Sequence, residues 1–113
     1  MKISHPLGVD ILEWKKARAF YDRHSGKIAS MLAPSERRFV NRTRRPDRAF
    51  AMIFAAQEAA FKAVGKPCRI LPRSAERFEV LNHPQLEGIL RETRRHVVAC
   101  CHALQSPRCA GTC

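Results

Sequence analysis

The chain has 113 residues, enough for one domain, and its 45% apolar and 27% charged content is typical of a globular protein. Lysine and arginine number 21 against 10 acidic residues, for a formal net charge of +11. Nucleic acid, an acidic protein or a phosphorylated cofactor would each be attracted by that charge. No segment approaches the roughly 18 apolar residues of a membrane span, and Asp10 and Glu13 interrupt any apolar core of a signal peptide. These features predict a cytoplasmic protein.

The cysteines form no recognisable framework. Their odd count, in a chain that shows no secretion signal, argues against structural disulfides. A zinc site built with His96 and His102 would need pairs two to four residues apart, and the observed spacing fits that pattern poorly. We interpret the five as buried or tail thiols: Cys68, Cys100, Cys101, Cys109 and Cys113.

The first half of the chain predicts a strand followed by three helices. Apolar side chains recur in residues 2–11 and indicate a strand, in which Pro6 favours an edge position or a bulge. Helices are predicted over residues 13–24, from Pro34 onward, and over residues 46–64. Proline is favoured in the first turn of a helix, and both later helices begin with one.

The second half changes character. Residues 77–81, 86–90 and 96–104 read as short strands, and the turn residues 82–84 separate the first two. Residues 105–113 are predicted to be a flexible tail. One strand, three helices and then two or three strands indicate an α+β fold.

The segment that is richest in chemistry lies in the long predicted helix. Glu58 and Lys62 are four residues apart and therefore share one helix face. Such a pair is usually an exposed ion pair, but here nearly all flanking residues are alanine or phenylalanine, which allows a close approach to another element. A carboxylate beside a cation in an apolar frame suits a metal–phosphate site. The carboxylate binds a hard divalent cation, and the lysine binds a phosphate.

Magnesium usually takes one or two protein carboxylates, so a second acid should come from another element. Asp10 is the best candidate because it ends an apolar strand and follows Gly8, which permits a close backbone approach. The alternative interpretation of Asp10 is a helix N-cap. The sequence therefore predicts a site at which Asp10 meets Glu58.

Three short motifs support this pairing. Residues 8–11 read Gly-Val-Asp-Ile, residues 31–36 read Met-Leu-Ala-Pro-Ser-Glu, and residues 54–59 read Phe-Ala-Ala-Gln-Glu-Ala. They resemble motifs of the holo-acyl-carrier-protein synthase type of 4'-phosphopantetheinyl transferase, over residues 5–66. The resemblance implies one domain over residues 1–104, with an antiparallel sheet packed on a long central helix.

The resemblance also implies an activity and a set of site residues. The family moves 4'-phosphopantetheine from coenzyme A to a serine of an apo acyl carrier protein, for fatty-acid or polyketide biosynthesis. Carried over by motif, the Mg²⁺ ligands are Asp10 and Glu58, and the catalytic residues are Asp10, Glu58 and Lys62. The residues implied to contact coenzyme A are Lys62, Gln57, Phe54 and Arg45.

Two kinds of partner follow from the resemblance. Acyl carrier proteins are acidic, and the family recognises them through a basic first helix, which corresponds here to Lys15, Lys16 and Arg18. Family members of this size usually form homotrimers with active sites between subunits.

The chain departs from the family pattern at three places. Gln57 replaces a lysine, Gly65-Lys66-Pro67 replaces a glycine-rich loop, and Arg91-Glu92-Thr93 aligns with a strand that carries histidine in the family. These departures predict weaker coenzyme A binding or slower turnover. Two alternatives stay open: a carrier-binding module of the same fold without catalysis, and a basic nucleic-acid-binding domain.

Overall fold

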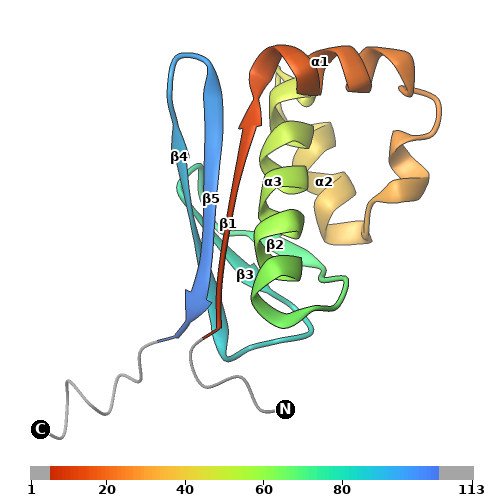
Figure 1. Cartoon of the computed structure of the whole chain (residues 1–113). Coiled ribbons are helices and arrows are strands. Elements are labelled where there is room, and N and C mark those ends of the chain that lie inside the picture. Colours follow the sequence, from red (N-terminus) through yellow and green to blue (C-terminus); the bar gives the residue numbers. More distant parts are fainter. Residues whose placement is uncertain (1–5, 105–113) are drawn as a thin grey trace, which may run out of the picture.

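The computed structural model describes residues 6–104 and has an α+β architecture (Figure 1). A five-stranded antiparallel sheet has the strand order β1-β5-β4-β3-β2, and the helices lie on one of its faces. The strands are β1 (Leu7–Glu13), β2 (Ile70–Pro72), β3 (Arg77–Val80), β4 (Leu86–Glu92) and β5 (His96–Ala103). The helices are α1 (Trp14–Arg23), the short 3₁₀ helix η1 (Ile28–Met31), α2 (Pro34–Arg42) and α3 (Pro46–Val64).

The long helix α3 is the centre of the molecule and lies between the sheet and α2 (Figure 1). It begins with Pro46 and ends at Val64, and the following Gly65 caps it with a φ of 74°, the left-handed conformation typical of a helix C-terminus. Its alanines are buried because they allow the helix axis to approach the neighbouring strands closely, as the sequence predicted: Ala51, Ala55, Ala56, Ala59 and Ala60 are all fully buried. The predicted long central helix packed on an antiparallel sheet is confirmed.

The edge strand β1 has two different faces. On the inner face, a Cβ atom added to Gly8 would overlap the carbonyl oxygen of Ala59, so only glycine permits this contact with α3. On the outer face, Leu7, Val9 and Ile11 have exposed fractions of 62%, 42% and 63%. The predicted edge position is confirmed, because β1 pairs with β5 and with no other strand of residues 6–104.

Helix α1 closes one end of the core. Its Phe20 stacks on Phe50 and Phe54 of α3, with ring centroids 5.8 and 6.4 Å apart. Its first residue, Trp14, is bound to the turn between β4 and β5, where the Trp14 amide donates to the Arg95 carbonyl oxygen at 2.9 Å. None of the described helices combines the length and the apolar character that a membrane crossing requires.

Most element boundaries lie within one or two residues of the predicted ones; the strand predicted over residues 86–90, for example, extends to Glu92. Strand β1 extends two residues beyond Ile11, and its predicted start at residues 2–5 lies outside the described residues. Strand β2 was not predicted, because three residues ending in proline carry no periodic signal. The predicted tail, residues 105–113, also lies outside the described residues, together with Cys109 and Cys113.

Candidate active site

The contact between β1 and α3 brings Asp10 and Lys62 together. The Lys62 Nζ atom lies 3.2 Å from Asp10 Oδ1 and donates to the Val9 carbonyl oxygen at 3.0 Å. The side chain of Asp10 is 17% exposed and that of Lys62 is 52% exposed. Two residues far apart in the sequence therefore form a partly shielded ion pair at the place where Gly8 lets strand and helix touch.

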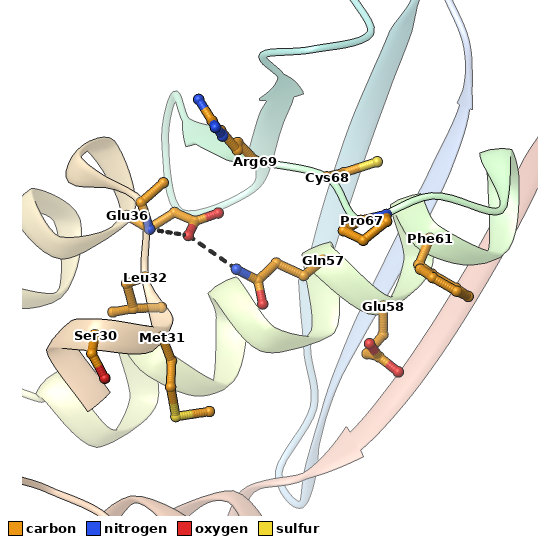
Figure 2. A pocket seen from close by; sticks show the side chains of 11 residues that line it. Ser30, Met31, Leu32, Glu36, Gln57, Glu58, Phe61, Pro67, Cys68 and Arg69 are labelled. Atoms are coloured by element: carbon orange, nitrogen blue, oxygen red, sulfur yellow. Dashed lines mark hydrogen bonds between the residues drawn. The ribbon is translucent and has the colours of Figure 1, made fainter. Parts of the chain in front are cut away.

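Glu58 lies one helical turn before Lys62 and is only partly exposed. Figure 2 shows its side chain on the side of α3 that is next to β1. It also lines a cavity of about 470 Å³, whose apolar wall includes Met31, Phe61 and Pro67. The structure thus brings Asp10 together with Lys62, while Glu58, one turn earlier on α3, lines the neighbouring cavity, which neither Asp10 nor Lys62 lines.

The donor chemistry of this region fits magnesium. Asp10 and Glu58 supply hard oxygen donors, and magnesium usually takes only one or two protein carboxylates and completes its shell with water and phosphate. Among residues 6–104, no three His, Cys, Asp or Glu side chains gather into a metal-binding group. Within the described residues, Asp10 and Glu58 are the two carboxylates that could hold a cation here, with water and phosphate completing its shell.

Gln57 points to a different neighbour from Glu58. Successive residues on a helix are about 100° apart around its axis, and Figure 2 shows Gln57 directed toward Glu36 of α2. Its Nε2 atom donates to Glu36 Oε1 at 3.0 Å. Gln57 still lines the cavity, but its amide is occupied by this hydrogen bond.

Glu36 is a buried carboxylate that sequence reasoning missed as a part of the site. It is 1% exposed and accepts hydrogen bonds from the backbone amides of Ala33 and Ile70, each at 2.7 Å, as well as from Gln57. It therefore connects the start of α2, strand β2 and helix α3 around one wall of the cavity. The available signal was its place three residues after Ala33, where a glutamate accepts from the N-cap amide.

Replacing Glu36 with alanine is expected to lower the free energy of unfolding by about 2 kcal/mol, because the amides of Ala33 and Ile70 lose their acceptors inside the protein. Urea denaturation would measure the change. The control is Glu79→Ala, which removes an exposed glutamate whose one ion pair among the described residues is with Arg73, and it should cost less than about 1 kcal/mol. Equal costs for the two variants would contradict the proposed role of Glu36.

The other predicted site residues lie outside the Asp10–Lys62 region. Phe54 is part of the aromatic cluster with Phe20 and Phe50. Arg45 pairs with Asp47 at 3.4 Å, at the start of α3. Three predicted carrier-protein contacts are exposed on α1: Lys15, Lys16 and Arg18.

Three of the cysteines are described, and all three are free thiols. Cys68 and Cys101 are buried, and Cys100 is half-buried on β5. Burial, with smaller contributions from Cys68 and Cys100, raises the pKa of Cys101 to about 12. Its thiol is therefore neutral and unreactive near neutral pH.

Comparison with known proteins connects this geometry to a family. A sequence profile of the 4'-phosphopantetheinyl transferase superfamily matches residues 6–113. The chain is 40% identical over 62 residues to a holo-acyl-carrier-protein synthase of Aromatoleum aromaticum, which covers 54% of this chain and 50% of that protein. The chain thus spans about half the length of this curated relative.

Solved structures share the fold. The holo-acyl-carrier-protein synthase from Neisseria meningitidis superposes with a TM-score of 0.72 at 20% identity, covering 88% of this chain and 98% of that one. The synthase from Bacillus anthracis in complex with coenzyme A (3',5'-ADP) gives a TM-score of 0.61 at 21% identity, covering 89% and 96%. Since the sequence profile extends over nearly the whole chain, the protein belongs to the 4'-phosphopantetheinyl transferase superfamily.

Proposed function

We propose that this chain transfers 4'-phosphopantetheine from coenzyme A to a serine hydroxyl of an apo acyl carrier protein, in a reaction that depends on Mg²⁺. The observation that carries the proposal is the Asp10–Lys62 ion pair at 3.2 Å, one helical turn from Glu58, at the glycine-mediated contact of β1 with α3. Membership of the superfamily and the resemblance to holo-acyl-carrier-protein synthases support the same reaction.

The three residues have distinct roles in this proposal. Asp10 and Glu58 hold the magnesium ion, which when bound supplies charge neutralisation at the pyrophosphate of coenzyme A. Lys62 binds a phosphate oxygen as a point charge. In the structure, the Lys62 ammonium forms an ion pair with the Asp10 carboxylate. We propose that this ammonium moves from Asp10 to a phosphate of coenzyme A when magnesium and coenzyme A bind together.

The proposed transfer is a substitution at phosphorus, in which one P–O bond forms and another breaks. The serine oxygen forms a bond to the phosphorus that carries pantetheine, and the bond from that phosphorus to the bridging oxygen of the pyrophosphate breaks. The leaving group is 3',5'-bisphosphate adenosine. Glu58 accepts the serine proton, directly or through water.

Coenzyme A is proposed to occupy the cavity of about 470 Å³ beside Glu58, where Met31 and Phe61 provide apolar contacts. The structures of relatives bound to coenzyme A support this donor. Gln57 stands where the family has lysine, so this position has lost a positive charge, and coenzyme A is expected to bind more weakly. The Gln57 amide donates to Glu36, so its effect on coenzyme A is expected to be indirect, through the position of Glu36 in the cavity wall. Phe54 and Arg45 stay proposed contacts of coenzyme A.

We further propose that the protein forms a homotrimer. Strand β1 is an edge strand whose outer side chains, Leu7, Val9 and Ile11, are largely exposed. Three neighbouring apolar side chains on one strand favour burial against another copy.

The acyl carrier protein is proposed to bind helix α1 through Lys15, Lys16 and Arg18.

The proposal is tested by incubating the protein with coenzyme A, Mg²⁺ and a panel of apo acyl carrier proteins. Intact-mass spectrometry is expected to detect the mass of one phosphopantetheine group on at least one carrier, and chelation of Mg²⁺ should abolish the gain. Carriers that remain unmodified throughout the panel, while still binding the protein, would favour the alternative of a non-catalytic carrier-binding module.

A further inference from the structure

The start of α1, the start of α3 and the turn between β4 and β5 lie at one end of the molecule (Figure 1). A cluster of cationic side chains lies there around Trp14. Two adjoining cavities of about 270 and 400 Å³ share Trp14, Lys15 and Arg94 in their walls. We call this surface the basic groove and define it by its six cations: Lys15, Arg18, Arg45, Arg48, Arg94 and Arg95.

The groove is held in place by interactions of Trp14. The indole nitrogen of Trp14 donates to the Thr93 carbonyl oxygen at 3.0 Å, and the Trp14 amide donates to the Arg95 carbonyl oxygen at 2.9 Å. The guanidinium carbon of Arg48 lies 4.3 Å from the centroid of the indole ring. The β4–β5 turn is therefore fastened to α1, and its two arginines stay next to Lys15.

Two acidic residues, Glu13 and Asp47, also line the two cavities, so the positive charge of the six cations is partly neutralised. Arg45 pairs with Asp47 and Arg48 pairs with Glu92, each at 3.4 Å. Arg18 reaches Asp22 only at 3.9 Å, with both side chains about two-thirds exposed. Within residues 6–104, no acidic side chain lies within 4.0 Å of the charged groups of Lys15, Arg94 and Arg95, which are exposed. Like charges held together in this way repel each other, and an anionic partner would relieve the repulsion.

The positions of the aromatic ring and the charges in the basic groove favour one class of anionic partner over the others. Nucleic-acid strands are commonly bound by stacking bases on exposed aromatic rings, but Arg48 covers the face of Trp14. A compact phosphate is commonly bound at a helix N-terminus, but Asp47 already places a carboxylate in the first turn of α3. The unpaired cations lie on α1 and on the β4–β5 turn, an arrangement that suits several separate carboxylates on one protein surface.

We propose that the basic groove docks an acidic surface of a partner protein, and that the β4–β5 turn contributes Arg94 and Arg95 to this contact. The inference rests on the proposed function for the identity of its partner, an apo acyl carrier protein. It adds a docking element outside α1 that neither the motifs nor the basic first helix indicate.

The test compares two double variants that remove the same charge. Arg94→Ala/Arg95→Ala keeps the backbone carbonyl that Trp14 binds. Arg38→Ala/Arg77→Ala removes two exposed arginines from α2 and β3 that have no ion pair among the described residues. Fluorescence anisotropy with a labelled apo acyl carrier protein should give an affinity about tenfold weaker for the first variant and nearly unchanged for the second. Coenzyme A binding should be unchanged in both.

Equal carrier affinities in the two variants, or no carrier binding by the wild type, would overturn the inference. Displacement of the carrier by micromolar inorganic pyrophosphate would also overturn it. So would a short DNA duplex that binds the wild type more tightly than the carrier does and no longer binds Arg94→Ala/Arg95→Ala.

The two proposals can fail separately. If the groove variant transfers phosphopantetheine with an unchanged KM for the carrier, docking fails and the activity stands. If the wild type binds the carrier through the groove but transfers nothing, the activity fails and docking stands.

Discussion

Replacing Glu58 with glutamine is expected to lower the rate of phosphopantetheine transfer roughly thousandfold. The amide keeps the shape of the side chain but loses the negative charge that holds magnesium and the basicity that accepts the serine proton. Because Glu58 is partly exposed and has no hydrogen-bond partner among the described residues, the free energy of unfolding should change by less than about 0.5 kcal/mol. A single-turnover assay and urea denaturation would measure the two quantities.

Glu79→Gln is the matched control for this variant, since it makes the same chemical change on an exposed side chain of β3, away from the cavity. It should retain the wild-type rate. A role in binding magnesium also predicts that Glu58→Gln needs a higher Mg²⁺ concentration for half-maximal activity. A variant that keeps the wild-type rate, at the wild-type magnesium requirement, would remove Glu58 from the site.

Replacing Gly8 with alanine is expected to destabilise the protein by more than about 3 kcal/mol. The new Cβ atom would overlap the Ala59 carbonyl oxygen and crowd the Ala63 amide nitrogen. Both are backbone atoms of α3, so no side-chain rotation relieves the clash, and strand and helix must move apart. That movement would also separate Asp10 from Lys62, so transfer activity should fall together with stability.

Gly26→Ala provides the control for this backbone clash. A Cβ atom at Gly26 would meet nothing within 4 Å, so its stability and activity should stay near those of the wild type. Thermal melting of both variants, with activity measured well below each melting temperature, separates unfolding from displacement of Asp10. A Gly8→Ala protein as stable as Gly26→Ala would contradict the close contact of β1 with α3.

The features of the candidate site that can be predicted from the sequence depend on local patterns. The spacing of Glu58 and Lys62 fixes a shared helix face, and the glycine before Asp10 has no other evident use in a strand. The structure brings Asp10 into contact with Lys62 for these reasons. The alanines of α3 were also informative, because their small size is useful only where another element packs closely.

The parts that the sequence did not predict depend on contacts between distant residues. Strand β2 is three residues long, and the Ile70 amide at its start donates to Glu36, 34 positions earlier. Nothing in the number or spacing of acidic residues distinguishes Glu36 from the exposed glutamates, although it is fully buried. The direction of Gln57 follows from helix geometry, but the partner that it reaches depends on how α2 packs against α3.

The alternation of side chains along β1 has a consequence for how the protein would respond to dilution. Leu7, Val9 and Ile11 face outward, while Gly8 and Asp10 between them face α3. If copies of the chain associate through these outward residues, association orders the backbone of β1. That backbone also positions the Asp10 carboxylate. Subunit binding and magnesium binding would then be thermodynamically linked, so each would strengthen the other and the activity per subunit would rise with protein concentration.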